Sequence, residues 1–149
     1  VTNNSVTARS VDGALLELNT SGNVVVTGNH FLQEALPSAG WLALDVVTNS
    51  TTALTVSDNE FSNLGRAIRL YSDGHEFAGS ITNNSFDFPI TYMPAAAEVA
   101  ALNGAAIDLD LRSNRWGQVQ TPEELASYVL AYADDTSTLE LDYSTVLTD

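Results

Sequence analysis

The segment Ile81-Thr82-Asn83-Asn84-Ser85-Phe86 carries the pattern that decides the fold, because the chain repeats it several times. In each copy an apolar residue is followed three positions later by Asn, and an apolar or aromatic residue comes two positions after that Asn. The other copies are Val1–Val6, Val26–Phe31, Val56–Phe61 and Leu111–Trp116. Their Asn residues follow one another at steps of 25, 30, 25 and 30 residues. Self-similarity at this period indicates a repeat architecture.

Short apolar segments with a period of two precede the repeat copies. Residues two apart in a strand share one face, so these segments predict strands with an inward and an outward side. The apolar pairs are Leu16 and Leu18, Val24 and Val26, Leu42 and Leu44, Leu54 and Val56, Ile68 and Leu70, and Leu109 and Leu111. Strands this short bury their apolar faces only when successive repeats stack, which predicts long parallel sheets around one continuous core.

The five aligned copies resemble the right-handed parallel β-helix repeat family, the pectate-lyase-like architecture that pectate lyases, polygalacturonases, many adhesins and phage tailspikes share. The segment Asn114-Arg115-Trp116-Gly117, followed by a helix and a strand, is similar to the C-terminal portion of many secreted members. The resemblance implies an all-β, right-handed solenoid of about five turns over residues 1–116. Residues 117–149 are then expected to form a cap over the open end of the solenoid.

In this family a recurring Asn at a corner of the solenoid usually stacks on the Asn residues above and below it. A side-chain amide has donors and an acceptor, so a column of amides can satisfy itself and the bent backbone. The resemblance therefore implies a structural ladder of Asn4, Asn29, Asn59, Asn84 and Asn114. An aromatic column is expected beside it, formed by Phe31, Phe61, Phe86 and Trp116. His30 occupies a position where the other copies have Ser, Glu or Arg, which indicates an outward surface position.

Residues 117–149 contain the signals of one helix and one strand. Thr121 can cap a helix that begins with Pro122 and carries two Glu residues in its first turn. The apolar stripe that follows consists of Leu125, Val129 and Tyr132. This stripe predicts a helix over about 122–134, and the alternation after it predicts a strand over about 138–146.

A segment without the repeat pattern interrupts one turn between Phe86 and Gly104. Pro89 and Pro94 break it, and the alanines over 95–102 predict a short helix. We expect the segment either to pack against the solenoid or to offer a lateral ligand surface. The ligand-binding candidates on that surface are Phe88, Tyr92 and Met93.

The formal charge of −14, from 5 Lys plus Arg against 19 Asp plus Glu, excludes several partners. Such a field repels nucleic acid and anionic membrane surfaces, and it repels a polyanionic polysaccharide unless bound cations reverse the local sign. The chain has no cysteine, which removes disulfides, thiolate nucleophiles and cysteine-based zinc sites. No apolar run approaches the ~18–20 residues of a membrane span, so no membrane insertion is expected.

Two groups of polar residues are the candidates for chemistry. Asp73, His75 and Glu76 lie in a polar loop and bring an imidazole near two carboxylates, as general acid–base catalysis requires. Asp108 and Asp110 share one outward face and offer oxygen ligands to Ca²⁺, the one cofactor that the sequence suggests. A solvated surface is the alternative for both groups. The polygalacturonase-like set of an acidic pair, Gly-His-Gly and Arg-x-Lys is missing, which counts against hydrolase activity.

The sequence therefore favours a non-catalytic C-terminal part of a secreted or cell-surface β-helix protein that acts in adhesion, scaffolding or carbohydrate binding. The alternative is the terminal section of a polysaccharide lyase or glycoside hydrolase. The chain begins inside a repeat copy at Val1, which suggests a mature product or a fragment without its upstream turns. We expect an extracellular, cell-surface or periplasmic bacterial protein whose partners are polysaccharides or surface glycans. Self-association through the uncapped N-terminal end is also expected.

Overall fold

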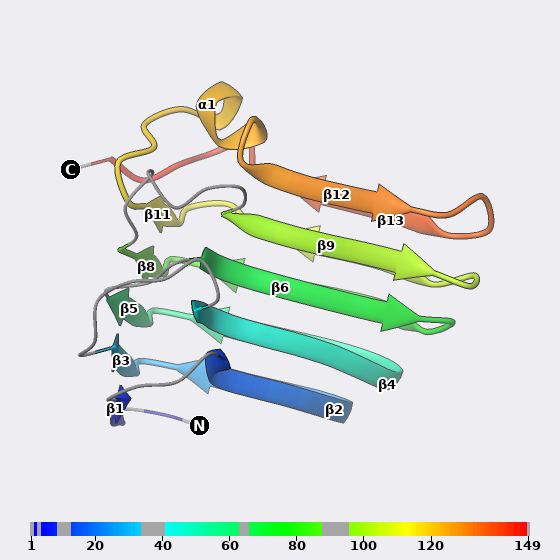
Figure 1. Cartoon of the computed structure of the whole chain (residues 1–149), viewed down its shortest axis with the longest axis horizontal. Helices are drawn as coiled ribbons and strands as arrows, with labels where there is room; N and C mark the ends of the chain where they lie inside the picture. The colour runs from blue at the N-terminus through cyan, green and yellow to red at the C-terminus, as the bar shows by residue number, and fades with distance from the viewer. Residues whose placement is uncertain are drawn as a thin grey trace.

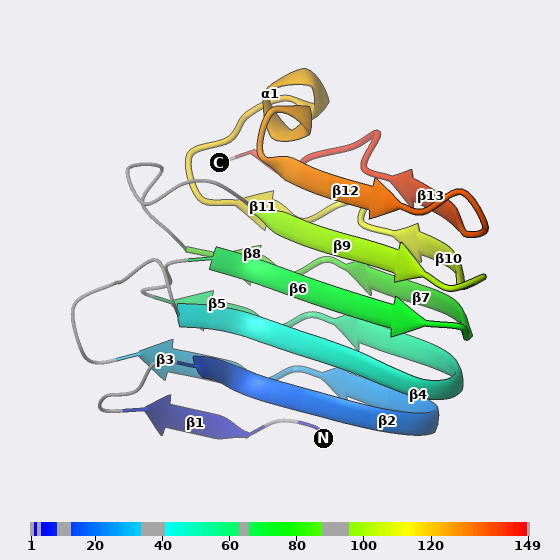
Figure 2. The same cartoon turned by 45° about the vertical axis from the view of Figure 1, so that its right-hand side comes forward.

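The computed structural model describes residues 2, 4–8, 13–33, 41–62, 66–87 and 96–148. Within them the chain forms an all-β parallel solenoid with three parallel sheets, as Figures 1 and 2 show. Successive repeats of the sequence lie on one another, so equivalent residues of consecutive copies become partners in adjacent strands. The stacked parallel architecture predicted from the Asn repeat is therefore confirmed.

The first sheet stacks five parallel strands, which are visible side by side in Figure 2. They are, in order, β2 (Gly13–Thr27), β4 (Trp41–Ser57), β6 (Arg66–Asp73), β9 (Ala97–Leu102) and β12 (Val129–Ala133). The long strands β2 and β4 pass through a corner of the solenoid, so their second halves begin the second sheet. The remaining strands of that sheet are β7 (Glu76–Thr82), β10 (Ala106–Asp110) and β13 (Thr138–Asp142).

The third sheet consists of short strands that follow the ladder corner. They are, in order, β1 (Ser5–Ala8), β3 (His30–Gln33), β5 (Glu60–Ser62), β8 (Ser85–Phe86) and β11 (Arg115–Trp116). The chain visits the three sheets in turn in three central circuits, β4–β5, β6–β8 and β9–β11. β2 and β3 pass through the same three sheets before these circuits, β1 precedes them, and β12 and β13 follow at the other end, whereas the family resemblance implied about five turns.

Apolar side chains from all three sheets fill one continuous interior. Leu44, Ile68 and Leu109 are fully buried, as the period of two predicted for their strands requires. The aromatic column consists of Phe31, Phe61, Phe86 and Trp116, whose successive ring centroids lie 4.8, 5.0 and 4.9 Å apart. This spacing equals the ordinary distance between neighbouring strands, ~4.8 Å, so each circuit contributes one ring to a continuous stack.

The C-terminal segment differs from the helix expected over about 122–134. α1 spans only Pro122–Ala126, and its N-cap is Thr121, as predicted. The residues expected to continue the helix form β12, where Val129 pairs with Ala97 of β9. A short helix is marginal by itself, whereas an added strand satisfies its backbone groups against β9, so sheet pairing outweighs the helical spacing.

The end of the chain continues the solenoid. β13 lies beside β10 and covers only the first part of the strand expected over about 138–146, since it ends at Asp142. Val146 adds an isolated bridge to Asn114. Leu125 of α1 is fully buried. The role of residues 117–149 as a cap stays a prediction.

The short helix expected over 95–102 is wrong. Residues 97–102 form β9, in which Ala97, Val99 and Ala101 are buried and alternate with less buried residues. Alanine favours helices in isolation, but β9 lies between β6 and β12, where pairing on both edges and small inward side chains favour a strand. No helix among the described residues is long and apolar enough to cross a membrane.

Candidate functional site

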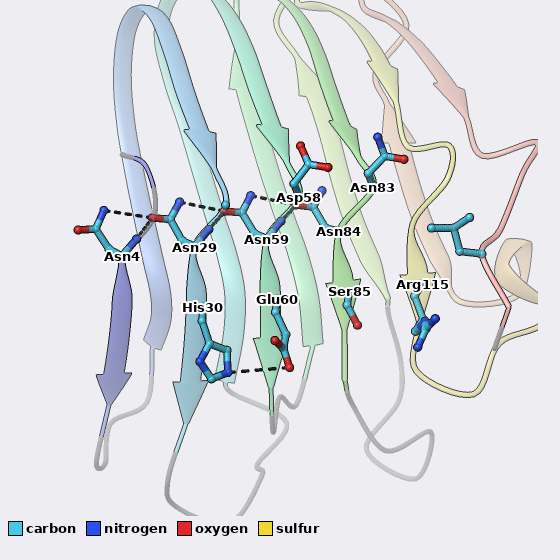
Figure 3. Close-up of a pocket in the computed structure, with 12 residues that line it drawn as sticks. Asn4, Asn29, His30, Asp58, Asn59, Glu60, Asn83, Asn84, Ser85 and Arg115 are labelled. Atoms are coloured by element: carbon cyan, nitrogen blue, oxygen red, sulfur yellow. Dashed lines mark hydrogen bonds and ion pairs between the residues drawn. The ribbon is translucent and has the colours of Figure 1, made fainter.

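An open groove of about 840 Å³ follows the corner between the second and third sheets, and we call it the axial groove. The residues that line it are Asn4, Gly28, Asn29, His30, Asp58, Asn59, Glu60, Asn83, Asn84, Ser85, Arg115 and Leu147. These residues occupy equivalent positions on successive circuits. The groove therefore crosses the strands and runs along the axis of the solenoid, as Figure 3 shows.

The floor of the axial groove is formed by four Asn side chains, those of Asn4, Asn29, Asn59 and Asn84, which Figure 3 shows in a row. Asn114 continues this ladder beyond Asn84. Each of the first four Asn residues donates its backbone N–H and its Nδ2–H to Oδ1 of the next one, over 2.8 to 3.1 Å. Asn29, Asn59, Asn84 and Asn114 are buried, whereas Asn4 at the end of the ladder is exposed. Because these amides bond to one another and to neighbouring backbone carbonyls, the buried part of the ladder is structural.

One wall of the axial groove comes from the residues directly before the ladder Asn residues. Asp58, Asn83 and Ser113 have φ near +57°, and Gly28 has φ +65° at the same position of its circuit. Only Gly, Asn and Asp adopt this left-handed conformation readily, which explains most of the residue choice here. The conformation turns the chain sharply from the second sheet into the third. In Figure 3 Asp58 and Asn83 project on the side of the ladder opposite His30 and Glu60.

The other wall comes from the residues directly after the ladder Asn residues. His30, Glu60, Ser85 and Arg115 are register partners in β3, β5, β8 and β11. The His30 Nε2 atom lies 3.9 Å from the Glu60 Oε1 atom, and these side chains are 45% and 63% exposed. The row thus offers solvent an imidazole, a carboxylate, a hydroxyl and a guanidinium at successive steps, and we call it the polar row.

A second hollow, of about 440 Å³, lies on the second sheet and is lined by three carboxylates, those of Glu76, Asp108 and Glu140. Asp108 and Glu140 are register partners, and the same outward column continues through Ala78 to Ala53. The small alanine side chains leave room beside the acids. The structure thus brings two predicted candidates, Glu76 and Asp108, to one place, which we call the acidic recess.

Asp110, the other predicted calcium ligand, is engaged by a neighbouring cation. Arg112 Nε donates to Asp110 Oδ1 at 3.0 Å, and Arg112 Nη2 donates to Asp110 Oδ2 at 2.9 Å. This guanidinium holds the pKa of Asp110 below its ordinary value. Among the described residues, no group of three or more His, Asp or Glu side chains is placed to hold a metal ion. Calcium at Asp108 and Asp110 stays a prediction.

Asp73 belongs to a chain of polar contacts at the corner between the first and second sheets, which we call the carboxylate corner. Asn103 Nδ2 donates to Asp73 Oδ1 at 2.6 Å, and the Asn103 backbone N–H donates to Asp134 Oδ2 at 2.7 Å. The Asn103 N–H, followed by the hydroxyl of Ser137 and by the hydrogen bonds from Thr136, lowers the pKa of Asp134 to about 2.

The predicted acid–base group is therefore divided. Asp73 lies at the carboxylate corner and Glu76 lines the acidic recess, while the His75 backbone carbonyl accepts a hydrogen bond from the Ser72 hydroxyl. Neither the axial groove nor the acidic recess contains all three residues. The predicted ligand-binding residues lie outside the described part of the chain; they are Phe88, Tyr92 and Met93.

Sequence reasoning placed His30 on the surface but gave the polar row no role, and it missed Glu140. The position of the polar row could have been predicted, because each member directly follows a ladder Asn. The four residue types differ, however, so they did not stand out as one group. Glu140 lies next to Asp108 only because the segment 138–142 pairs with 106–110, and the sequence between these segments does not predict that register.

No protein family profile matches the chain, and neither a curated protein nor a solved structure is significantly similar to it. The fold is therefore defined by its own strand register, and function must be argued from the surfaces described above.

Proposed function

We propose that this chain is a non-catalytic, carbohydrate-binding part of a secreted or cell-surface β-helix protein that acts in adhesion. We further propose that the solenoid is right-handed and pectate-lyase-like, because crossovers between parallel strands are right-handed in nearly all proteins. Residues 117–149 would close its C-terminal end, and the full burial of Val119 and Leu125 supports this.

The axial groove carries the proposal. Its polar row presents four equivalent positions of successive circuits at the ~4.8 Å spacing of parallel strands, so the three steps between them span about 14 Å. A linear polymer that lies along the axis meets a hydrogen-bonding side chain at each step. The hydroxyls of a polysaccharide both donate and accept, which matches a polar row in which donors and acceptors follow one another.

Charge narrows the class of polysaccharide. The net charge of −14 and the carboxylates of Asp58 and Glu60 disfavour uronate polymers, so neutral glycans are the favoured ligands. The ladder beneath the groove fixes the backbone of every circuit, so the row is pre-organised, and binding costs little further ordering.

A glycan array followed by titration calorimetry tests the proposal. The double variant His30→Ala, Glu60→Ala removes two neighbouring members of the polar row, and Glu123→Ala is a control that removes an exposed acid from α1. We expect the double variant to raise the Kd of the bound glycan about tenfold and the control to leave it unchanged. Absence of binding to every array glycan, or an equal loss in the control, contradicts the proposal.

The acidic recess supports a second candidate, the terminal section of a glycoside hydrolase or polysaccharide lyase. Hydrolysis of a glycosidic bond requires a carboxylic acid and a carboxylate on either side of the bond, and Glu76, Asp108 and Glu140 surround one hollow. Release of reducing ends or of unsaturated uronates, lost separately in Glu76→Gln and Asp108→Asn, is the expected result. Activity that persists in both variants, or silence across a broad polysaccharide panel, counts against this candidate.

A further inference from the structure

Large apolar side chains are exposed on the outward side of the first sheet, away from the axial groove. Leu130 is 46% exposed and Tyr132 is 60% exposed, and both belong to β12. They are register partners of Glu98 and Ala100, the residues of β9 that alternate with its buried ones. Strands β12, β9 and β6 lie side by side in Figure 2, so residues of this side form one continuous surface.

The strand register aligns two tyrosines on this surface. Tyr132 pairs with Ala100, and Ala100 pairs with Tyr71 of β6, so the three residues form one outward column. Tyr71 and Tyr132 are therefore two strands apart, about 9.6 Å at the ordinary strand spacing. Because the side chain between them is only a methyl group, this part of the column has a tyrosine on either side of a low middle, and the column continues from Tyr71 to Val47 of β4. We call it the tyrosine face.

The neighbouring outward column supplies fixed polar groups. It contains Arg69 and Glu98, which are register partners in β6 and β9. Arg69 Nε donates to Asp45 Oδ1 at 3.0 Å, and Arg69 Nη2 donates to the other carboxylate oxygen of Asp45. This two-point ion pair holds the guanidinium in place beside the tyrosine column.

We propose that the tyrosine face is a stacking platform for a neutral saccharide, with pyranose rings over Tyr71 and Tyr132 and hydroxyls directed toward Arg69 and Glu98. The face of an aromatic ring carries negative potential and attracts the weakly positive C–H groups on the apolar side of a sugar ring. A guanidinium donates to hydroxyl oxygens, and a carboxylate accepts from hydroxyl hydrogens. The tyrosines therefore suit the apolar C–H face of a pyranose ring, and Arg69 and Glu98 suit its hydroxyl groups.

Charge selects this occupant over two others. Arg69 compensates the charge of Asp45, but Glu98 lies beside the tyrosine column and the chain carries −14 overall, so an anionic polysaccharide is repelled. A second copy of the chain would bring the same net charge to the contact and is disfavoured for the same reason. This site lies on a different sheet from the axial groove and binds by stacking, so it extends the proposed function to a second surface.

Titration calorimetry with neutral linear hexasaccharides of glucose, mannose, xylose and galactose tests the inference. Tyr132→Ala removes the more exposed ring, Tyr132→Phe keeps a ring, and Val25→Ala is the control, because it shortens an exposed apolar side chain on the second sheet. We expect Tyr132→Ala to raise the Kd for a bound hexasaccharide about tenfold, which corresponds to about 1.4 kcal/mol. Tyr132→Phe and Val25→Ala should change it by less than about twofold. Circular dichroism checks that each variant keeps its fold.

The outcomes separate this inference from the proposal for the axial groove. The tyrosine face is supported when Tyr132→Ala weakens hexasaccharide binding and the His30→Ala, Glu60→Ala variant does not. This result does not depend on whether the axial groove binds a glycan. Binding lost only in the double variant overturns the tyrosine face and leaves the groove in place. Absence of binding to all four hexasaccharides also overturns it. A dimer in sedimentation that Tyr132→Ala dissociates overturns it in favour of a second copy of the chain.

Discussion

Two corners border the second sheet, and the chain builds them from different residues. The corner between the second and third sheets uses the same neutral residue on each circuit, and Asn59 in its middle is buried and bonded on both sides. The carboxylate corner, between the first and second sheets, uses Asp73, Asn103 and Asp134, whose hydrogen bonds to one another are exposed. Both corners have polar contacts between adjacent circuits.

Burial explains the difference. A buried corner admits only a group that is neutral and satisfies itself, because an unpaired charge there is very costly. A solvated corner tolerates carboxylates, because water hydrates and screens their charges. We therefore expect the ladder to determine the stability of the fold and the carboxylate corner to determine its dependence on pH.

The largest expected effect comes from shortening a ladder residue. Asn59→Ala removes the Oδ1 atom that accepts from both the N–H and the Nδ2–H of Asn29, so two buried hydrogen bonds are lost while Asn29 Nδ2 keeps its bond to the Thr27 carbonyl oxygen. Unfolding by urea should show a loss of about 3 kcal/mol. Asn4→Ala, the same change at the exposed end of the ladder, should cost about 1 kcal/mol or less. Equal losses at the two positions would contradict the argument from burial.

A smaller effect is expected when charge is added to the carboxylate corner. Asn103→Asp replaces the amide that donates to Asp73 by a second carboxylate while keeping a residue that tolerates φ +53°. The lost hydrogen bond and the new repulsion should cost about 1 kcal/mol at neutral pH. Thermal unfolding measures the loss, and adding Asp73→Asn should recover most of it. A double variant no better than the single one would show that repulsion is not the cause.

The smallest effect concerns pH. The pKa of Asp134 is lowered from 3.8 to about 2, so its contribution to stability is fully present above about pH 4 and is lost as the pH falls toward about 2. Asp134→Asn keeps an oxygen for the Asn103 N–H but does not titrate. Thermal midpoints of wild type and variant should therefore converge between about pH 4 and about pH 2. A difference that stays constant over this range would disprove the assignment.

The regular corner was predictable from the sequence because the same residues recur there. Asn and Phe or Trp at fixed spacing carried the family resemblance that implied both the ladder and the aromatic column, and the strand register of the structure agrees with them. β9 and β12 were less accessible, because alanines over 97–102 and the spacing of Val129 and Tyr132 also suit a helix. Both segments form strands because they pair with neighbouring circuits, β9 with β6 and β12 with β9.

The candidate sites were predictable only in part. Asp108 and Asp110 were expected on one outward face, but the partner of Asp108 in the acidic recess, Glu140, comes from a strand whose register could not be deduced. The tyrosine face was missed because Tyr132 was assigned to a helix. The surface sites of a stacked fold depend on the register between neighbouring circuits. The sequence predicts this register only where the repeat is regular.

Cross-linking tests the central claim, that consecutive repeats lie on one another in the stated register. The chain has no cysteine, so paired substitutions report without background. Val25 and Thr55 are register partners, and Ser80 lies one strand further along the same column. We predict that Val25→Cys with Thr55→Cys oxidises to an intramolecular disulfide, since one strand spacing of ~4.8 Å suits a disulfide, and that Val25→Cys with Ser80→Cys, at about 9.6 Å, does not. Equal oxidation of both pairs, or oxidation of the second pair alone, would contradict the stacked register.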